Sequence, residues 1–144
     1  MLSDTPIEYR RDAFIITTDR TRIDPVAALS LLRTTFWAQD LDLEVLERAI
    51  RNSVSFGVFE GERLAGFGRV ITDLATYAYW TDVVVHASDR GRGLGRWLSE
   101  CMLAHPELQG LRRVALLTRD AVELYTRVGF SEGPGVLTYM ERRP

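Results

Sequence analysis

The spacing of hydrophobic positions changes part-way along the chain. Residues 12–19 (DAFIITTD) form a short apolar run that predicts a first strand. Apolar residues then recur every three to four positions, which is the helical period. Asp24 followed by Pro25 marks a helix start, because aspartate accepts N-cap hydrogen bonds and proline suits the first helical position. A second helix is predicted over residues 42–52.

From residue 55 the apolar period becomes two, which is typical of strands. Residues 55–60 and 64–72 predict a hairpin around a turn at Gly61 and Glu62. Residues 77–86 (YAYWTDVVVH) begin with aromatic and end with β-branched side chains. Such a segment favours a strand in the interior of the sheet.

The second half of the chain alternates helical and extended segments. We predict helices over 93–108 and 120–128, the latter with Asp120 as its N-cap, and strands over 113–118 and 136–142. The complete order is β-α-α-β-β-β-α-β-α-β, with a right-handed crossover expected near the end. This order predicts one mixed α/β (α+β) domain over residues 1–144.

Composition narrows the function classes. Hydrophobic residues make up 46% of the 144 positions and charged residues 26%, as in globular proteins. The net charge of -2 argues against a nucleic-acid partner, which normally binds a basic face. No apolar run reaches the roughly 18 residues of a membrane span, and the N-terminus lacks a signal-peptide core, so we expect a cytoplasmic protein without a membrane partner. With one cysteine and two histidines in the sequence, we expect no metal site.

All 18 basic residues are arginine, so chemistry that needs a lysine is excluded. This matters for the glycine-rich turn Arg90-Gly91-Arg92-Gly93-Leu94-Gly95, which lies between a predicted strand and a predicted helix. Glycines allow close backbone approach, and a helix N-terminus offers free N–H groups, so the turn is suited to a pyrophosphate. A P-loop would require a lysine, and a dinucleotide-binding turn would require glycine at Arg96.

The remaining pattern, R-x-x-G-x-G, resembles the acetyl-CoA loop of the GCN5-related N-acetyltransferase (GNAT) superfamily. A second motif, Ala121-x-x-Leu124-Tyr125-x-x-x-Gly129-Phe130, resembles the other signature of that superfamily. Residues 66–73 and 82–85 are also similar to a group of small bacterial members whose substrates are generally unassigned. The resemblance implies the GNAT acyl-CoA N-acyltransferase fold, a central mixed sheet flanked by helices, with acetyl-CoA as cosubstrate and no metal. It implies acetyl transfer to a primary amine of a small molecule or peptide.

The same resemblance assigns residues to the cofactor. The pantetheine would run along the strand at Val83, Val84 and Val85, and a backbone N–H there would polarise the thioester. Thr118 stands where an asparagine often helps to hold the cofactor, and Ala87 where a proline often follows the strand. The full set of cofactor residues is Val83, Val84, Val85, Arg90, Gly91, Arg92, Gly93, Leu94, Gly95, Arg96 and Thr118.

Two residues are candidates for catalysis. Tyr125 matches the tyrosine that protonates the departing thiolate, since a phenol with a pKa near ~10 is protonated at neutral pH. The alternative is a helical tyrosine that only packs its ring. Asp82, the acidic residue of the central strand, is expected on the face of Trp80 and Val84. It is either the base or ammonium anchor, or a buried partner of Arg69 on the neighbouring strand.

Other side chains have weaker indications. Trp37 and Tyr79 are expected to line the acceptor pocket, whereas His86 reads as an exposed loop residue and Cys101 as a packing residue. A protein that binds CoA without catalysis, as a sensor or partner-binding module, is the alternative function. Dimerisation of two copies through the last strands is compatible with this fold.

Overall fold

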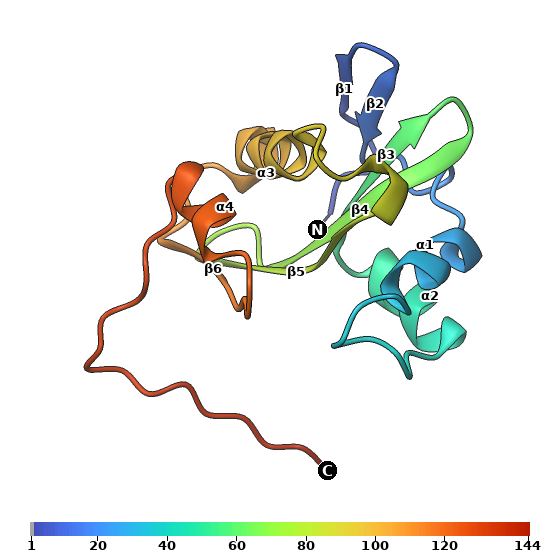
Figure 1. Cartoon of the computed structure of the whole chain (residues 1–144). Helices are drawn as coiled ribbons and strands as arrows, with labels where there is room; N and C mark the ends of the chain where they lie inside the picture. Colours follow the sequence, from blue (N-terminus) through green and yellow to red (C-terminus); the bar gives the residue numbers. More distant parts are fainter. Residues whose placement is uncertain (1) are drawn as a thin grey trace.

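A computed structural model describes residues 2–144 and contains one six-stranded sheet (Figure 1). The strands lie in chain order, from β1 (Glu8–Arg11) and β2 (Phe14–Thr17) through β3 (Val54–Glu60), β4 (Arg63–Thr72) and β5 (Tyr77–Val85) to β6 (Arg113–Leu116). The first five pair antiparallel, and β6 pairs parallel with β5. The predicted mixed sheet is therefore confirmed, with β5 in its interior.

The helices cover both faces of this sheet (Figure 1). On one side lie α1 (Pro25–Leu32) and α2 (Leu43–Arg51), and on the other α3 (Leu94–Ala104) and α4 (Val122–Arg127). The predicted cap of α1 is confirmed, because the Asp24 side chain accepts from the Val26 N–H. The structure adds a cap for α2, where the Asp42 side chain accepts from two N–H groups of the helix.

Each face of the sheet has its own buried cluster, which we call the α3 core and the α1 core. The α3 core combines Trp80, Leu98, Met102 and Tyr125, whereas the α1 core combines Leu32, Leu46, Phe67 and Val84. Successive side chains of β3, β4 and β5 point to opposite faces of the sheet, so the helices on each face pack against a different set of strand residues. None of the helices within residues 2–144 has the length and apolar character needed to cross a membrane.

Three details of the sequence prediction are wrong at the C-terminal half. Residues 136–142 form no strand: they are exposed, and no neighbouring strand pairs with their backbone. Alternating side chains permit a strand, but a strand also requires a ladder partner. The N-cap of α4 is Ala121 rather than Asp120, and the Thr118 hydroxyl accepts from the Ala121 N–H. The helix predicted over 93–108 ends at Ala104 and is followed by a short 3₁₀ turn, Pro106–Leu108.

The N-terminal strand prediction also misses a feature. Residues 12–19 contain β2, but its partner β1 precedes it, with a turn at Asp12, where φ is 53°. The polar sequence of β1 (EYRR) gives no strand signal by itself. This strand forms because β2 offers a free edge next to it.

A β-bulge interrupts the pairing of β4 with β5. Phe67 pairs with Val84 and Arg69 with Thr81, so Asp82 and Val83 together stand opposite Gly68. Asp82 takes a left-handed conformation with φ of 58°. The bulge reverses the alternation of β5: Trp80 packs in the α3 core and Val84 in the α1 core. The expectation that Asp82 shares one face with both residues is therefore wrong.

Candidate active site

A cleft of about 640 Å³ opens where β5 and β6 separate. Their pairing ends at Trp80 and Leu116, although β5 continues to Val85. The residues beyond Trp80 therefore have no β6 partner on that side. Six residues singled out from the sequence line this cleft together, namely Trp37, Tyr79, Asp82, Val83, Thr118 and Tyr125.

Asp82, which lines the cleft, accepts hydrogen bonds from two neighbouring side chains. Its Oδ2 accepts from Nε of Arg69 at 3.0 Å and lies 2.9 Å from the Arg69 Nη2, and its Oδ1 accepts from Nε1 of Trp37 at 3.2 Å. The side chains of Asp82 and Arg69 are only 9% and 13% exposed. The ion pair with Arg69 that the sequence suggested is therefore present, and both carboxylate oxygens are engaged, while a catalytic role of Asp82 stays a prediction. The pair satisfies a charge that would otherwise be costly to bury.

Tyr125 lies on α4 with its ring buried among aromatic side chains. The ring makes edge contacts with Trp80 and Phe130, with centroids 6.3 and 5.9 Å away. Burial raises the pKa of the Tyr125 phenol above its usual value, because the phenolate would lose hydration. This phenol lines the cleft and remains protonated at neutral pH.

The glycine-rich turn leads directly into α3. Gly91 and Gly93 have φ of 81° and 76°, a left-handed conformation that favours glycine, and Gly93 is the N-cap of α3. No side chain caps this helix start, so the N–H groups of its first turn lack a side-chain acceptor. A Cβ at Gly91 would meet nothing within 4 Å, and a Cβ at Gly93 would lie 3.6 Å from Nη2 of Arg11, so the space beside Gly91 is open and a further guanidinium stands beside Gly93. The turn fits a bound pyrophosphate.

The start of α3, where the glycine turn ends, lies against α4 and the end of β5. A Cβ built on Gly95 would lie 3.7 Å from Cδ2 of Leu124, the residue before Tyr125, and 3.9 Å from Cγ2 of Val85. The turn, the end of β5 and the start of α4 therefore meet at one place. Val83 and Val85 are half-buried, while the Val84 side chain is buried in the α1 core.

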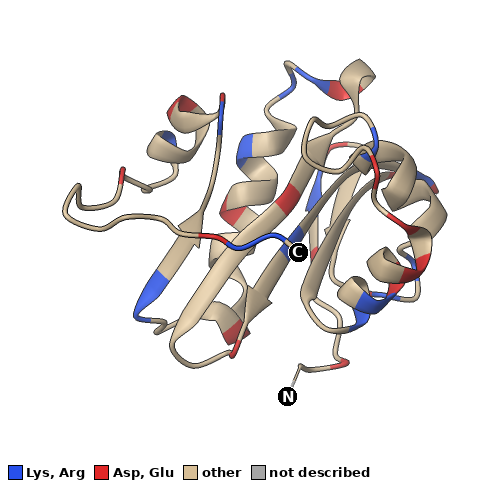
Figure 2. Cartoon of the chain, turned by 90° about the horizontal axis from the view of Figure 1, so that it is seen from below, with Lys and Arg blue, Asp and Glu red and all other residues tan. Residues whose placement is uncertain are grey.

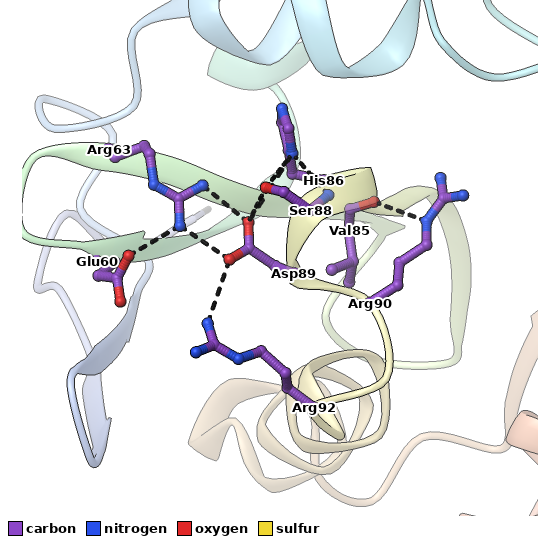
Figure 3. A network of polar contacts seen from close by, with 8 residues as sticks. All are labelled: Glu60, Arg63, Val85, His86, Ser88, Asp89, Arg90 and Arg92. Atoms are coloured by element: carbon purple, nitrogen blue, oxygen red, sulfur yellow. Dashed lines mark hydrogen bonds and ion pairs between the residues drawn. The ribbon is translucent and has the colours of Figure 1, made fainter.

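The arginines of the turn contact protein groups. Nε of Arg90 donates to the Val85 carbonyl at 3.3 Å, and Nε of Arg96 donates to Glu100 at 3.2 Å. The Arg92 Nη1 lies 3.5 Å from Oδ1 of Asp89. The Val85 carbonyl, expected from the resemblance to face the pantetheine, thus receives a guanidinium in this structure (Figure 3).

Asp89 was missed from the sequence and lies at the centre of the contacts drawn in Figure 3. It directly precedes the glycine turn and is almost fully buried. The guanidinium of Arg63 donates to both of its oxygens at 2.8 Å. Hydrogen bonds from Arg63 lower the pKa of the Asp89 carboxyl, more than burial raises it. The sequence does contain one signal that could have pointed to Asp89, because an acidic residue stands directly beside a turn that is predicted to bind an anion.

Part of the cleft lining is aromatic. Phe36 and Trp37 pack edge to face with centroids 5.2 Å apart, and the Arg119 guanidinium stands 3.6 Å from the Phe36 ring centroid. Tyr79 also lines the cleft, and its pKa is raised by burial first and then by neighbouring acidic groups, including Tyr139. Tyr139 belongs to the exposed C-terminal segment, which passes the cleft mouth.

Two other candidates lie away from the cleft. His86 is exposed, and its Nδ1 accepts from the Ser88 N–H. Cys101 is buried in the α3 core, and burial raises the pKa of its thiol to about 11. No group of three potential metal ligands occurs among residues 2–144. Acidic and basic positions are interspersed over the helices and strands (Figure 2). The ribbon of the described residues shows no extended region of a single charge.

The arrangement matches a known family of enzymes. Residues 24–130 match the model of the acetyltransferase (GNAT) family. The chain belongs to the GNAT family. It is 31% identical to FG08082 of Gibberella zeae, a protein named as an acetyltransferase, over 143 residues that cover 83% of this chain and 80% of the fungal protein. The resemblance inferred from the two sequence motifs is thereby confirmed.

Solved structures agree with this GNAT assignment. A GNAT-family protein of Xanthomonas campestris pv. campestris superposes with a TM-score of 0.84 at 42% identity, covering 91% of this chain and 93% of that one. Glucosamine-6-phosphate N-acetyltransferase of Arabidopsis thaliana superposes with a TM-score of 0.67 at 19% identity, covering 90% and 97%. The second likeness shows the fold alone. The protein is therefore an acetyltransferase of the GNAT type.

Proposed function

We propose that the protein transfers the acetyl group of acetyl-CoA to a primary amine of a small molecule or peptide. The observation that carries the proposal is the meeting of the glycine turn, β5 and α4 around Gly95. The helix that contacts α3 at Gly95, close to the anion-binding turn, also carries Tyr125, a protonated tyrosine that lines the open cleft. A phosphate-bearing thioester needs both features, one for its pyrophosphate and one for its leaving sulfur.

In the proposed reaction the amine nitrogen attacks the thioester carbon directly. A carbon–nitrogen bond forms and the carbon–sulfur bond breaks, while the nitrogen loses a proton and the sulfur gains one. Tyr125 supplies the proton to sulfur from its hydroxyl. Its raised pKa keeps the hydroxyl protonated until the thiolate departs. Backbone N–H groups of β5 beyond Trp80, which β6 does not pair, stabilise the developing oxyanion.

Asp82 has a supporting part in this proposal. Both of its oxygens accept hydrogen bonds from Arg69 and Trp37, so it has little capacity to take a proton from the substrate. It instead fixes the indole of Trp37 at the cleft. The ammonium proton passes to water, and Trp37 and Tyr79 contact the body of the acceptor.

The test is a panel of primary amines assayed by release of free thiol from acetyl-CoA, with thermal-shift titrations of CoA, NADH and ATP alongside. We expect stabilisation by CoA alone and turnover with at least one amine. Stabilisation without turnover on a broad panel would favour the CoA-binding sensor. A melting curve unaffected by CoA would refute the cofactor assignment.

A further inference from the structure

The buried carboxylate of Asp89 requires an explanation, because a negative charge beside a pyrophosphate site repels the ligand. Asp89 ends the short 3₁₀ turn Ala87–Asp89, and its side chain is 3% exposed. Only Arg90, Gly91 and Arg92 separate it from the N-cap of α3. A carboxylate so placed affects the turn through its position rather than through contact with a ligand.

The partner of Asp89 comes from another part of the sheet. Arg63 is the first residue of β4, and its Nη1 and Nη2 each donate to one Asp89 oxygen at 2.8 Å. Such a two-pronged contact fixes both the distance and the orientation of the two groups. Figure 3 shows Arg63 reaching across from the β3–β4 hairpin, where Glu60 accepts its remaining hydrogen bond at 2.9 Å. The pair therefore ties the turn to the hairpin.

The same carboxylate also holds groups of the turn itself. Arg92 lies 3.5 Å from Oδ1, Ser88 donates to Oδ2 at 3.4 Å, and His86 lies 3.9 Å from Oδ2. The Asp89 N–H donates to the His86 carbonyl at 2.9 Å, which closes the 3₁₀ turn. Asp89 is thereby held through its backbone and its side chain, and it restrains the Arg92 guanidinium.

We propose that Asp89 and Arg63 are positioning residues for the pyrophosphate turn. Glycines at 91 and 93 give the turn the required left-handed backbone but also a large freedom when no ligand is bound. With Asp89 fixed at one end and α3 at the other, that freedom is confined to the four residues 90–93. Arg63 neutralises the charge of Asp89, so the carboxylate does not weaken the attraction of the turn for phosphate. The inference rests on the proposed binding of CoA.

The experiment compares two ligands on each variant by calorimetry: CoA, and pantetheine, which has the thiol arm but no phosphate. We expect Asp89→Asn and Arg63→Gln each to raise the Kd for CoA on the order of 10- to 100-fold, as expected for a misplaced binding group, with the Kd for pantetheine unchanged. The double variant should lose little more than either single one, because the two act as one unit. Glu60→Gln is the matched control: it removes the other carboxylate on Arg63 and should leave both values unchanged.

The conservative variant Arg63→Lys retains the charge but not the two-pronged contact, and should give a Kd for CoA between those of the wild type and Arg63→Gln. This variant keeps the proposal testable if Asp89→Asn fails to fold. Equal changes for CoA and pantetheine, or no change for either ligand, would overturn the positioning role while the proposed function stands. A wild-type protein that does not bind CoA would instead overturn the proposed function, and this inference with it.

Discussion

Replacing Asp82 by asparagine separates a structural from a chemical role of this residue. The amide keeps the shape of the carboxylate but has one acceptor oxygen and a donating NH₂. In the native structure Arg69 donates to Oδ2 and Trp37 donates to Oδ1. Whichever way the amide turns, its NH₂ faces a donor. The arrangement with the oxygen toward Arg69 is the less costly, because Trp37 is about half exposed.

The expected magnitude follows from what remains around Arg69. Its side chain is 13% exposed, and the guanidinium would retain the amide oxygen and the Ser53 hydroxyl at 3.4 Å, but no counter-charge. Removing one partner of a buried ion pair typically costs about 3–5 kcal/mol, and the remaining contacts favour the lower end, about 3 kcal/mol. For a chain of this length that loss lowers the Tm by roughly 10 °C.

The assay is chemical denaturation together with kcat/KM for the amine. Arg69→Met in the Asp82→Asn background removes the stranded charge, so the double variant should be less destabilised than the two single changes added together. Glu141→Gln makes the same chemical change at an exposed position on the cleft and should alter the free energy of unfolding by less than ~0.5 kcal/mol. An Asp82→Asn protein of native stability with kcat/KM reduced ~100-fold would refute the reasoning, and would assign Asp82 to the chemistry.

Three further outcomes are expected. Tyr125→Phe should retain CoA affinity and slow turnover by roughly 10²-fold. Because burial raises the pKa of Tyr125, the wild-type rate should not fall with rising pH until above pH ~10. A decrease in rate that begins near pH ~8 would contradict this role of Tyr125. Gly93→Val should abolish CoA binding, whereas Gly110→Val, at a distant turn with a similar φ of 73°, should cost comparable stability and leave binding intact; equal loss in both would point to unfolding. Cys101, whose thiol pKa is raised to about 11 by burial, should resist alkylation at pH 8 in the folded protein and react on denaturation, and rapid native reaction would be inconsistent with its packing.

Signals that act within one turn of the chain were predicted well. Asp24 caps its helix as expected, because an N-cap needs only the two or three residues that follow it. The two-residue period likewise located β3, β4 and β5. The glycine turn and Tyr125 were found because each belongs to a motif with short, fixed spacing.

Three features that depend on distant parts of the chain were not predicted. The orientation of Asp82 follows from a register shift against β4, which no local pattern reveals. Residues 136–142 have the side-chain alternation of a strand but no paired neighbour. Asp89 finds its partner 26 positions away in Arg63, so its importance emerges only once the sheet brings the hairpin beside the turn.

The bulge in β5 makes the length of this strand as important as its composition. Two residues there face Gly68 alone, and the extra one places Val84 toward α1 and leaves Val83 and Val85 toward α3. Deleting Asp82 or Val83 would restore a regular ladder and exchange the faces of either everything before the deletion or everything after it. Single substitutions in this strand alter one side chain at a time. A one-residue deletion would instead undo both hydrophobic clusters together, so in this stretch insertions and deletions should be far less tolerated than replacements.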